Sequence, residues 1–357
     1  MYQYFSSLIF SVARILDKSA DLSCYIVEDL GDTSLFDCLG NEQLIEKTVA
    51  WLPSLQLAGA EGLDFSKCYP VEAMDSRSVM WDLNYFKYCF LKPTGIEFDE
   101  SQLESEFERF STRLLDSTYE WGFMYRDFQS RNVMIVDDNP YFIDFQGGRR
   151  GPIQYDLVSF LWQARAGFSP DFRLRMVDAY MDNLAKYVRF DRKAFRKSLK
   201  PYILFRLLQV LGAYGFRGLV QNKTHFIVSI VPAVKSLAYE LENGVAEEYP
   251  YLKSLLMRVI ESEMFSVNSY DGLTVRVNSF GFRKSGIPRD MSGNGGGFVF
   301  DCRALPNPGR LNEYKPLTGR DKAVRDYLEQ YEEVEEFFSH ASAMSVNAVK
   351  RYLERGF

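Results

Sequence analysis

The spacing of apolar residues predicts a chain that is mostly helical as far as residue 265. In several long windows an apolar residue recurs every three to four positions, which is the period of an amphipathic helix. Shorter apolar runs bounded by turn-forming residues predict strands at 23–28, 133–136 and 141–144. The predicted helices are residues 4–16, 41–55, 78–92, 100–121, 158–168, 171–188, 192–216 and 246–265.

The pattern changes after residue 265. Residues 266–272 are a polar stretch that we interpret as a linker between a domain at 1–265 and a second domain at 273–357. Strand signals at 273–280 and 298–303, followed by a helix from Asp321, predict a mixed α/β second domain. The glycine-rich run at 293–297 precedes a predicted strand, whereas phosphate-binding loops precede a helix. We therefore interpret it as a flexible loop.

Three side chains around the predicted hairpin at 133–144 carry the candidate chemistry. Asp127 and Asn132 precede its first strand with four residues between them, and Asp144 ends its second strand. Phosphoryl transfer needs a base that orients the attacking hydroxyl, together with oxygen ligands for Mg²⁺. The pattern predicts Asp127 as the base and Asn132 and Asp144 as the metal ligands. An ordinary hairpin with surface acids is the alternative, and it leaves these spacings as coincidence.

This stretch resembles the aminoglycoside phosphotransferase and choline kinase branch of the protein-kinase-like fold. That family has H-x-D-x-x-x-x-N before a strand that ends I-D, and here Tyr125 stands at the histidine. The run GPIQYDL at 151–157 matches the family's G-x-x-x-Y-D-L. The resemblance implies an α+β protein-kinase-like fold that uses ATP and Mg²⁺, in which Tyr125, Arg126 and Asp156 brace the loop.

The same resemblance bears on the segment after the first predicted strand. Glu28, Asp29 and Leu30 stand where the family has the hinge that holds adenine, although a plain turn and helix capped by Asp32 or Thr33 fits the same residues. The family's glycine-rich loop and small-lobe lysine are not found before this strand. We therefore expect most of the helical large lobe and only part of the small lobe. Either the chain is truncated, or it is a degenerate relative that has lost phosphate clamping.

Two features bear on the acceptor. Residues 206–226 resemble a helix and turn of the bacterial anomeric kinases for N-acetylmuramate and N-acetylglucosamine, which implies a sugar hydroxyl as acceptor. Asp82 and Asn84, near the start of the helix predicted at 78–92, are candidates for facing it. We interpret the aromatic residues of that helix as core packing instead of a ligand site, and His225 as a structural histidine.

Residues 273–357 resemble the C-terminal domain of the RNase adapter RapZ. Its patterns S-F-G-(F/Y)-K-x-G-x-P, F-D-x-R-x-L-x-N-P and P-L-T-G-x-D recur in this order, at 279–286, 300–308 and 316–321. The chain ends before that family's C-T-G-G-x-H-R-S anion-binding segment, so we expect a partial domain. Arg303, Asn307 and Arg320 are candidates for the rest of that pocket; the alternative is that they are turn and sheet-edge residues.

The composition is that of a globular protein and narrows its partners. The 357 residues are 46% hydrophobic and 25% charged, and a net charge of −6 argues against wholesale binding to nucleic acid. No apolar run approaches the roughly 20 residues of a membrane span, so no membrane partner is expected. The five cysteines form no C-x-x-C pair, which predicts reduced, mostly buried thiols in a cytoplasmic protein.

The sequence as a whole favours an ATP- and Mg²⁺-dependent kinase that phosphorylates a hydroxyl of a small acceptor, an amino sugar or cell-wall sugar. The alternative is a catalytically weak regulatory protein that binds a nucleotide or sugar phosphate and contacts RNA or protein through its C-terminal domain. Tyr125 and the missing lysine favour this alternative, while the net negative charge weakens its RNA version.

Overall fold

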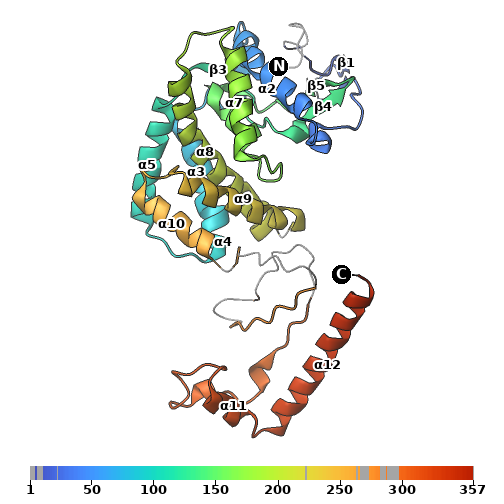
Figure 1. Ribbon diagram of the computed structural model, residues 1–357, viewed down its shortest axis with the longest axis vertical. Helices are drawn as coiled ribbons and strands as arrows, with labels where there is room; N and C mark the ends of the chain where they lie inside the picture. The colour runs from blue at the N-terminus through green and yellow to red at the C-terminus, as the bar shows by residue number, and fades with distance from the viewer. Residues whose placement is uncertain are drawn as a thin grey trace. The chain divides into compact units, whose positions relative to one another are not determined.

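The chain forms two compact units, Met1–Ser266 and Val267–Phe357. The computed structural model describes residues 5, 11–21, 23–221, 223–262, 264–265, 273–281, 287 and 297–356. The predicted linker at 266–272, and all but the last residue of the glycine-rich run at 293–297, lie outside the described residues. Figure 1 shows that helices dominate what is described.

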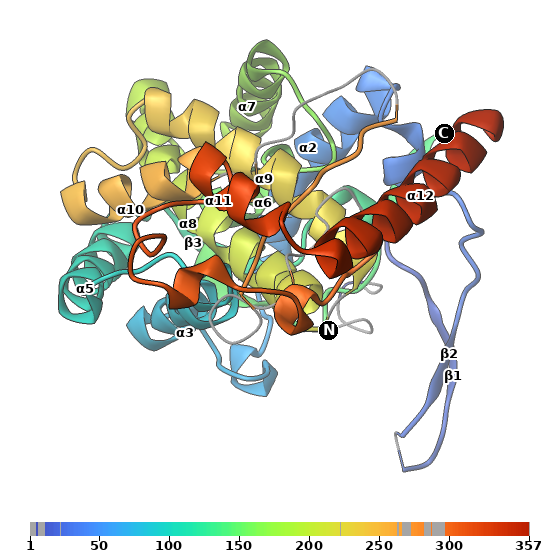
Figure 2. The ribbon, with the colours of Figure 1, turned by 90° about the horizontal axis from the view of Figure 1, so that it is seen from below.

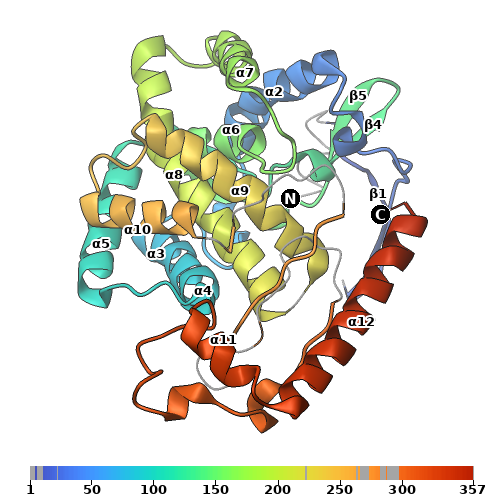
Figure 3. The ribbon, with the colours of Figure 1, turned by 60° about the horizontal axis from the view of Figure 1, so that its bottom comes forward.

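The first unit is built around one long apolar helix, Arg192–Tyr214. The helices of this unit are α2 (Glu42–Leu57), α3 (Ser76–Phe86), α4 (Lys92–Thr94), α5 (Glu100–Asp116), α6 (Ile153–Leu161), α7 (Pro170–Leu184), α8 (Arg192–Tyr214), α9 (Thr224–Glu242) and α10 (Pro250–Glu261). Helix α8 packs against α3, α6 and α9 (Figure 3), which is why it is apolar on more than one face. By length and composition, the stretch Arg192–Val220 would also suffice to cross a membrane, but most of it is buried inside the protein.

The described strands pair as three antiparallel two-stranded ribbons. These are β1 (Ile15–Lys18) with β2 (Tyr25–Val27), β3 (Trp121–Met124) with β6 (Arg149–Pro152), and β4 (Val133–Val136) with β5 (Asn139–Phe142). The β1–β2 ribbon extends away from the helices of its unit (Figure 2). Strand β3 lies so close to α2 that a Cβ on Gly122 would come within 2.4 Å of the Gln56 carbonyl oxygen. Only glycine fits at this position. This close approach lies just before the loop that carries Asp127.

The β4–β5 hairpin closes with a two-residue turn. Asp137 and Asp138 both have positive φ, 47° and 57°, as a type I′ hairpin turn requires. The sequence predicted this hairpin but placed its second strand at 141–144, which is wrong, because the turn uses two residues instead of four and β5 begins at Asn139. Lys47 Nζ donates to the Asp138 carbonyl oxygen (3.0 Å) and to Asn139 Oδ1 (2.6 Å), so the turn is tied to α2.

Several predicted helices have different bounds in the structure. The helix predicted at 4–16 is wrong in its described part beyond residue 5, because the Phe142 N–H donates to the Ser11 carbonyl oxygen (2.7 Å) and β1 begins at Ile15. The helix predicted at 100–121 ends at Asp116, and Trp121 already belongs to β3. Helix α9 was not predicted.

The helix that was predicted to end before Pro93 continues through it. After α3 the chain forms one π turn, Lys87–Leu91, and then α4, which ends at Gly95 in the left-handed conformation (φ 74°). A proline removes one helical hydrogen bond, and the π turn directly before it accommodates that loss. Phe86 and Phe90 of this segment are buried, as expected for core packing, whereas Trp81 and Tyr88 are exposed.

The second unit is described mainly as helices. These are α11 (Lys322–Leu328), which confirms the helix predicted to start at Asp321, and α12 (Glu332–Glu354). The strands predicted at 273–280 and 298–303 are wrong: these described residues form no strand, and Cys302–Ala304 is a short 3₁₀ helix. Alternating apolar residues form a strand only when another strand pairs with them; here Val277 is 91% exposed.

The five cysteines are free thiols, as predicted, but none is fully buried. Cys24 and Cys302 are exposed, and the others are half-buried.

Candidate active site

The residues between β3 and β4 form the loop that carries Asp127 and Asn132. Arg126 turns the chain sharply at its start with φ 79°, a strained value for a side chain other than glycine, and such strain is often found at functional sites. The Asn132 side chain is buried, and its Nδ2 donates to the main-chain carbonyl oxygen of Asp127 at 2.9 Å. Because that bond uses the amide nitrogen, the amide oxygen is the atom of Asn132 suited to a cation.

Asp144 lies beside Asn132 because the hairpin register brings both to its open end. The first residue of β4 pairs with the last residue of β5, and the Ile143 N–H donates to the Asn132 carbonyl oxygen at 3.1 Å. Asp144 is exposed, has φ 65°, and its Oδ1 accepts a hydrogen bond from Gln146 Nε2 at 2.6 Å. The structure therefore brings the two predicted metal ligands together.

An amide oxygen and a carboxylate at one edge suit Mg²⁺, which prefers hard oxygen ligands. In the part of the chain that the structure describes, no group of three or more His, Cys, Asp or Glu side chains is placed to hold a metal ion. A magnesium ion at Asn132 and Asp144 would therefore take its other ligands from water and from nucleotide phosphates. This is the usual way in which proteins bind Mg²⁺ together with a nucleotide.

The buried carboxylate of Asp156, in the first turn of α6, holds the start of the loop. Its Oδ2 accepts from the Tyr125 N–H (2.7 Å), and its Oδ1 accepts from the Arg126 N–H (3.0 Å). Gln56 Nε2 also donates to Oδ2 (3.3 Å), and Gln56 is itself held by the Tyr180 hydroxyl (2.6 Å). Burial raises the pKa of Asp156 to about 7, against the lowering effect of these N–H donors.

The raised pKa of Asp156 predicts a pH-dependent stability. Because its folded pKa of about 7 lies above the ordinary 3.8, the folded protein holds the proton more tightly than the unfolded chain. The free energy of unfolding should then fall by about 4 kcal/mol as the pH rises from about 4 to about 7. Urea unfolding at a series of pH values should show this slope in the wild type and not in Asp156→Asn.

The exposed Asp171 provides the matched control for that experiment, since Asp171→Asn removes a carboxylate without touching the loop. This variant should keep the wild-type slope. An Asp156→Asn protein with an unchanged slope would assign the pH dependence to other groups.

Tyr125, at the family's histidine position, links the loop to the open end of the hairpin. Its hydroxyl lies within hydrogen-bonding distance of two carbonyl oxygens, those of Ile143 and of Asn132 (3.3 Å). Its ring is buried against Phe128 and Phe145. The tyrosine thus contacts the backbone of one predicted metal ligand, Asn132, and of the residue directly before the other, Asp144.

Asp82 contacts the loop through Arg126. Arg126 Nη2 donates to both carboxylate oxygens of Asp82 (2.7 and 3.0 Å), and Gln209 Nε2 donates to one of them (3.0 Å). Burial by itself lowers the pKa of Arg126, but the interactions with Tyr155 and Asp82 outweigh it and raise the pKa above its ordinary value. Asn84 lies two residues further along α3 and therefore on a different face of the helix. That either residue faces the acceptor stays a prediction.

The predicted hinge, Glu28, Asp29 and Leu30, lies between β2 and a segment that runs beside β4. The Glu28 carboxylate is held by Arg14, through Nε (3.1 Å) and Nη2 (2.9 Å), and Asp29 Oδ1 accepts from the Gly31 N–H (2.9 Å). These side-chain contacts fix the segment, whereas the predicted adenine contacts use its backbone.

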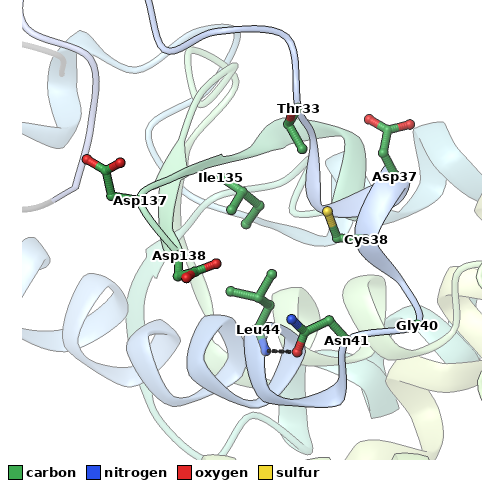
Figure 4. A pocket seen from close by; sticks show the side chains of 9 residues that line it. All are labelled: Thr33, Asp37, Cys38, Gly40, Asn41, Leu44, Ile135, Asp137 and Asp138. Atoms are coloured by element: carbon green, nitrogen blue, oxygen red, sulfur yellow. Dashed lines mark hydrogen bonds between the residues drawn. The ribbon is translucent and has the colours of Figure 1, made fainter.

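A hollow of about 600 Å³ lies beside the turn of the β4–β5 hairpin (Figure 4). The short 3₁₀ helix Leu35–Cys38 at its rim is capped by Ser34, and not by Asp32 or Thr33 as the alternative predicted. The hollow is lined by Thr33, Asp37, Cys38, Gly40, Asn41, Leu44, Ile135, Asp137 and Asp138. None of the candidate catalytic residues lines it, because the turn is the end of the hairpin opposite to Asn132 and Asp144.

The three candidates in the second unit contact near neighbours in the chain. Arg303 pairs with Asp301 (2.5 Å), and Asn307 Oδ1 accepts from the Gly309 N–H (3.0 Å). The main-chain N–H of Arg320 donates to a threonine hydroxyl two residues away (3.3 Å). These are turn-forming contacts, and an anion pocket at these residues stays a prediction.

Sequence reasoning missed three glutamines whose side chains hydrogen-bond to residues in or next to the loop. Gln56 binds Asp156, Gln209 binds Asp82, and Gln163 Oε1 accepts from both the N–H (2.9 Å) and the hydroxyl (2.8 Å) of Ser130. They lie on or next to helices far from the loop in the chain. The available signal was a polar residue in an apolar run, as in LPSLQL at the end of α2.

A helical unit, a hairpin with a carboxylate and an amide at its open end, and a buried carboxylate holding the loop before it define a protein of the protein-kinase-like class. The chain belongs to the phosphotransferase enzyme family, whose model matches residues 2–190. The model of the RapZ C-terminal domain matches residues 273–357. Both resemblances and the α+β protein-kinase-like fold are thereby confirmed.

Individual relatives match parts of the chain. The N-acetylmuramate/N-acetylglucosamine kinase of Neisseria meningitidis serogroup B is 28% identical over 181 residues, which is 48% of this chain and 52% of that protein. A nucleotide-binding protein of Thermotoga petrophila is 41% identical over 92 residues, 26% of this chain and 31% of that protein. The crystal structure of a choline kinase from Cryptosporidium parvum Iowa II has a TM-score of 0.49 and 12% identity, covering 72% of this chain and 80% of that one. The chain thus spans about half the length of the first relative and about a third of the second.

Proposed function

We propose that the first unit is a kinase that uses ATP and Mg²⁺ and transfers the γ-phosphate to a hydroxyl of a small, sugar-like acceptor. The observation that carries this proposal is the adjacency of Asn132 and Asp144 at the open end of the hairpin. The loop that leads into this edge also carries Asp127, and its start is fixed by Asp156.

Each residue then has a distinct task. Asp127 orients the attacking hydroxyl and accepts its proton. The hydrogen bond from the Asn132 side chain to the Asp127 main chain keeps this base at a fixed place beside the two proposed metal ligands. Bound magnesium would neutralise charge on the transferred phosphate. The backbone of Glu28, Asp29 and Leu30 holds the adenine.

An amino sugar or cell-wall sugar is the acceptor that we propose, supported by the name of the Neisseria relative. We further propose that residues 1–265 form the phosphotransferase domain, 266–272 a linker and 273–357 a RapZ-like domain. A cytoplasmic location is supported by the free thiols.

The second candidate is a regulatory protein that binds a nucleotide or sugar phosphate and contacts RNA or protein through residues 273–357. The match of these residues to the RapZ C-terminal domain favours it, as do relatives described as nucleotide-binding proteins.

The test is direct detection of the product. The chain is incubated with Mg²⁺, ATP and, in turn, N-acetylglucosamine, N-acetylmuramate and choline, and products are identified by phosphorus NMR. A phosphorylated amino sugar is the expected result, with choline unchanged. Binding of nucleotide without transfer to any acceptor would support the regulatory candidate instead.

A further inference from the structure

A small pocket beside the catalytic loop is lined by three arginines. Arg131 comes from the loop itself, Arg165 from the segment between α6 and α7, and Arg206 from α8. The other lining residues are uncharged, and Gln129 and Tyr214 are among them. The pocket therefore has a strongly positive wall with no carboxylate in it.

None of these three arginines forms an ion pair with a carboxylate among the described residues, although hydrogen bonds from Ser34 and, to a lesser degree, the charge of Arg131 lower the pKa of Asp37. Arg131 stacks on the ring of Phe36 (4.1 Å), and Arg206 Nη1 donates to the neutral Gln209 (2.7 Å). Arg206 Nε is buried and has no hydrogen-bond partner in the described part of the chain. A buried donor without a partner is costly, and an anion in the pocket would satisfy it and reduce the mutual repulsion of the three arginines, of which Arg131 and Arg165 are exposed.

The charges of all three arginines also affect the pKa of one tyrosine in the pocket. Burial raises the pKa of Tyr214, and the charges of Arg206, Arg165 and Arg131 all oppose that rise. The arginines therefore gather around this tyrosine, although they lie in three separate segments of the chain.

The position of the pocket next to the loop that carries Asp127 suits binding of the acceptor. Gln129 and Arg131 lie between Asp127 and Asn132 in the loop, and the pocket is completed by α8, by the segment after α6 and by Phe36 of the 3₁₀ helix Leu35–Cys38. In-line transfer places the acceptor and the nucleotide on opposite sides of the transferred phosphoryl group. A hydrogen-bonded chain also leads from Arg206 through Gln209 and Asp82 to Arg126, the residue before Asp127.

We propose that the acceptor carries an oxyanion, a carboxylate or a phosphate, and that Arg131, Arg165 and Arg206 bind it while Asp127 orients the hydroxyl. This inference rests on the proposed phosphotransferase function. The pocket measures about 50 Å³, against the roughly 30 Å³ that one water occupies in the liquid. It thus admits a charged substituent while the sugar ring stays over the loop. The planar fork of arginine suits either oxyanion.

Arg165→Gln is the sharpest variant, because Arg165 is exposed and lies outside both the loop and the core of α8. The measurement is kcat/KM for an amino sugar with a carboxylate and for an amino sugar phosphate, each divided by kcat/KM for N-acetylglucosamine. For whichever of the two substrates carries the oxyanion that the pocket binds, this ratio should fall about tenfold to hundredfold in Arg165→Gln. That is the usual contribution of a hydrogen bond to a charged group. The larger fall of the two identifies the oxyanion.

Two control variants separate local binding from general charge. Arg165→Lys keeps the charge and should retain most of the preference. Arg175→Gln removes an equal charge from an exposed arginine that pairs with Glu42, and it should leave the ratio unchanged.

The experiments give different results if the oxyanion pocket is wrong and if the proposed kinase function is wrong. If the wild type phosphorylates sugars but neither Arg165→Gln nor Arg131→Gln changes the ratio, the oxyanion pocket is overturned and the kinase proposal stands. If the wild type phosphorylates no acceptor, the proposed function fails, and calorimetric titration with inorganic phosphate and with acetate decides the pocket alone. Weaker binding of either anion in Arg165→Gln than in Arg175→Gln would support it, and equal binding of both would overturn it.

Discussion

Replacing Asp127 by asparagine should lower kcat by about a hundredfold to ten-thousandfold, the usual contribution of a positioned base. Asparagine has nearly the same shape but cannot accept the proton of the acceptor hydroxyl. The loop should keep its form, because Asn132 bonds to the main-chain carbonyl oxygen of Asp127 and not to its carboxylate. Initial rates at saturating acceptor and nucleotide measure the effect, and the affinity for nucleotide should stay close to that of the wild type.

The matched control for Asp127→Asn is Asp137→Asn in the hairpin turn. Asp137 is exposed, and asparagine tolerates its positive φ. This variant should leave kcat unchanged. Phosphoryl transfer at the wild-type rate in Asp127→Asn would show that Asp127 is not the base.

The part of the site that could be predicted from the sequence is the part that lies in one stretch of chain. Asp127, Asn132 and Asp144 are separated by a loop and a hairpin, so their spacing alone predicts that they meet. The position of β5 was wrong by two residues, because the type of turn depends on whether Asp137 and Asp138 adopt positive φ, and the run D-D-N-P does not decide that.

What the sequence did not predict depends on contacts between distant segments. Gln56 and Gln209 are additional partners of Asp156 and Asp82, respectively, and an amide near the end of an apolar helix has no local pattern that predicts its partner. The arginine pocket escaped prediction for the same reason, since its three arginines come from the loop, from the segment after α6 and from α8, which packs against α6.

The strands predicted in the second unit failed for a related reason. Residues 273–280 alternate apolar and polar side chains as a strand does, but the pattern specifies a strand only together with the segment that pairs with it. Helix α11 needs no such partner, because its hydrogen bonds lie within its own segment, and its start after Asp321 was predicted.

Removing the carboxylate of Asp144 should weaken the binding of magnesium-ATP by more than about tenfold, or 1.4 kcal/mol. Asp144 contacts the nucleotide only through the cation in the proposed site, so the binding of ATP in the presence of EDTA should change little. Calorimetric titration of nucleotide into the protein, with and without magnesium, separates the two effects.

Two substitutions at this position distinguish charge from backbone. Asp144 has φ 65°, which alanine adopts only with strain, whereas asparagine tolerates it. Asp144→Asn therefore removes the charge alone, and Asp144→Ala adds the backbone cost. If Asp144→Asn keeps full affinity for magnesium-ATP, the metal is not held at the open end of the hairpin. If both variants lose that affinity while Asp138→Asn, at the other end of the same hairpin, keeps it, the open end is where the cation binds. A wild-type chain that binds no nucleotide would instead count against the use of ATP.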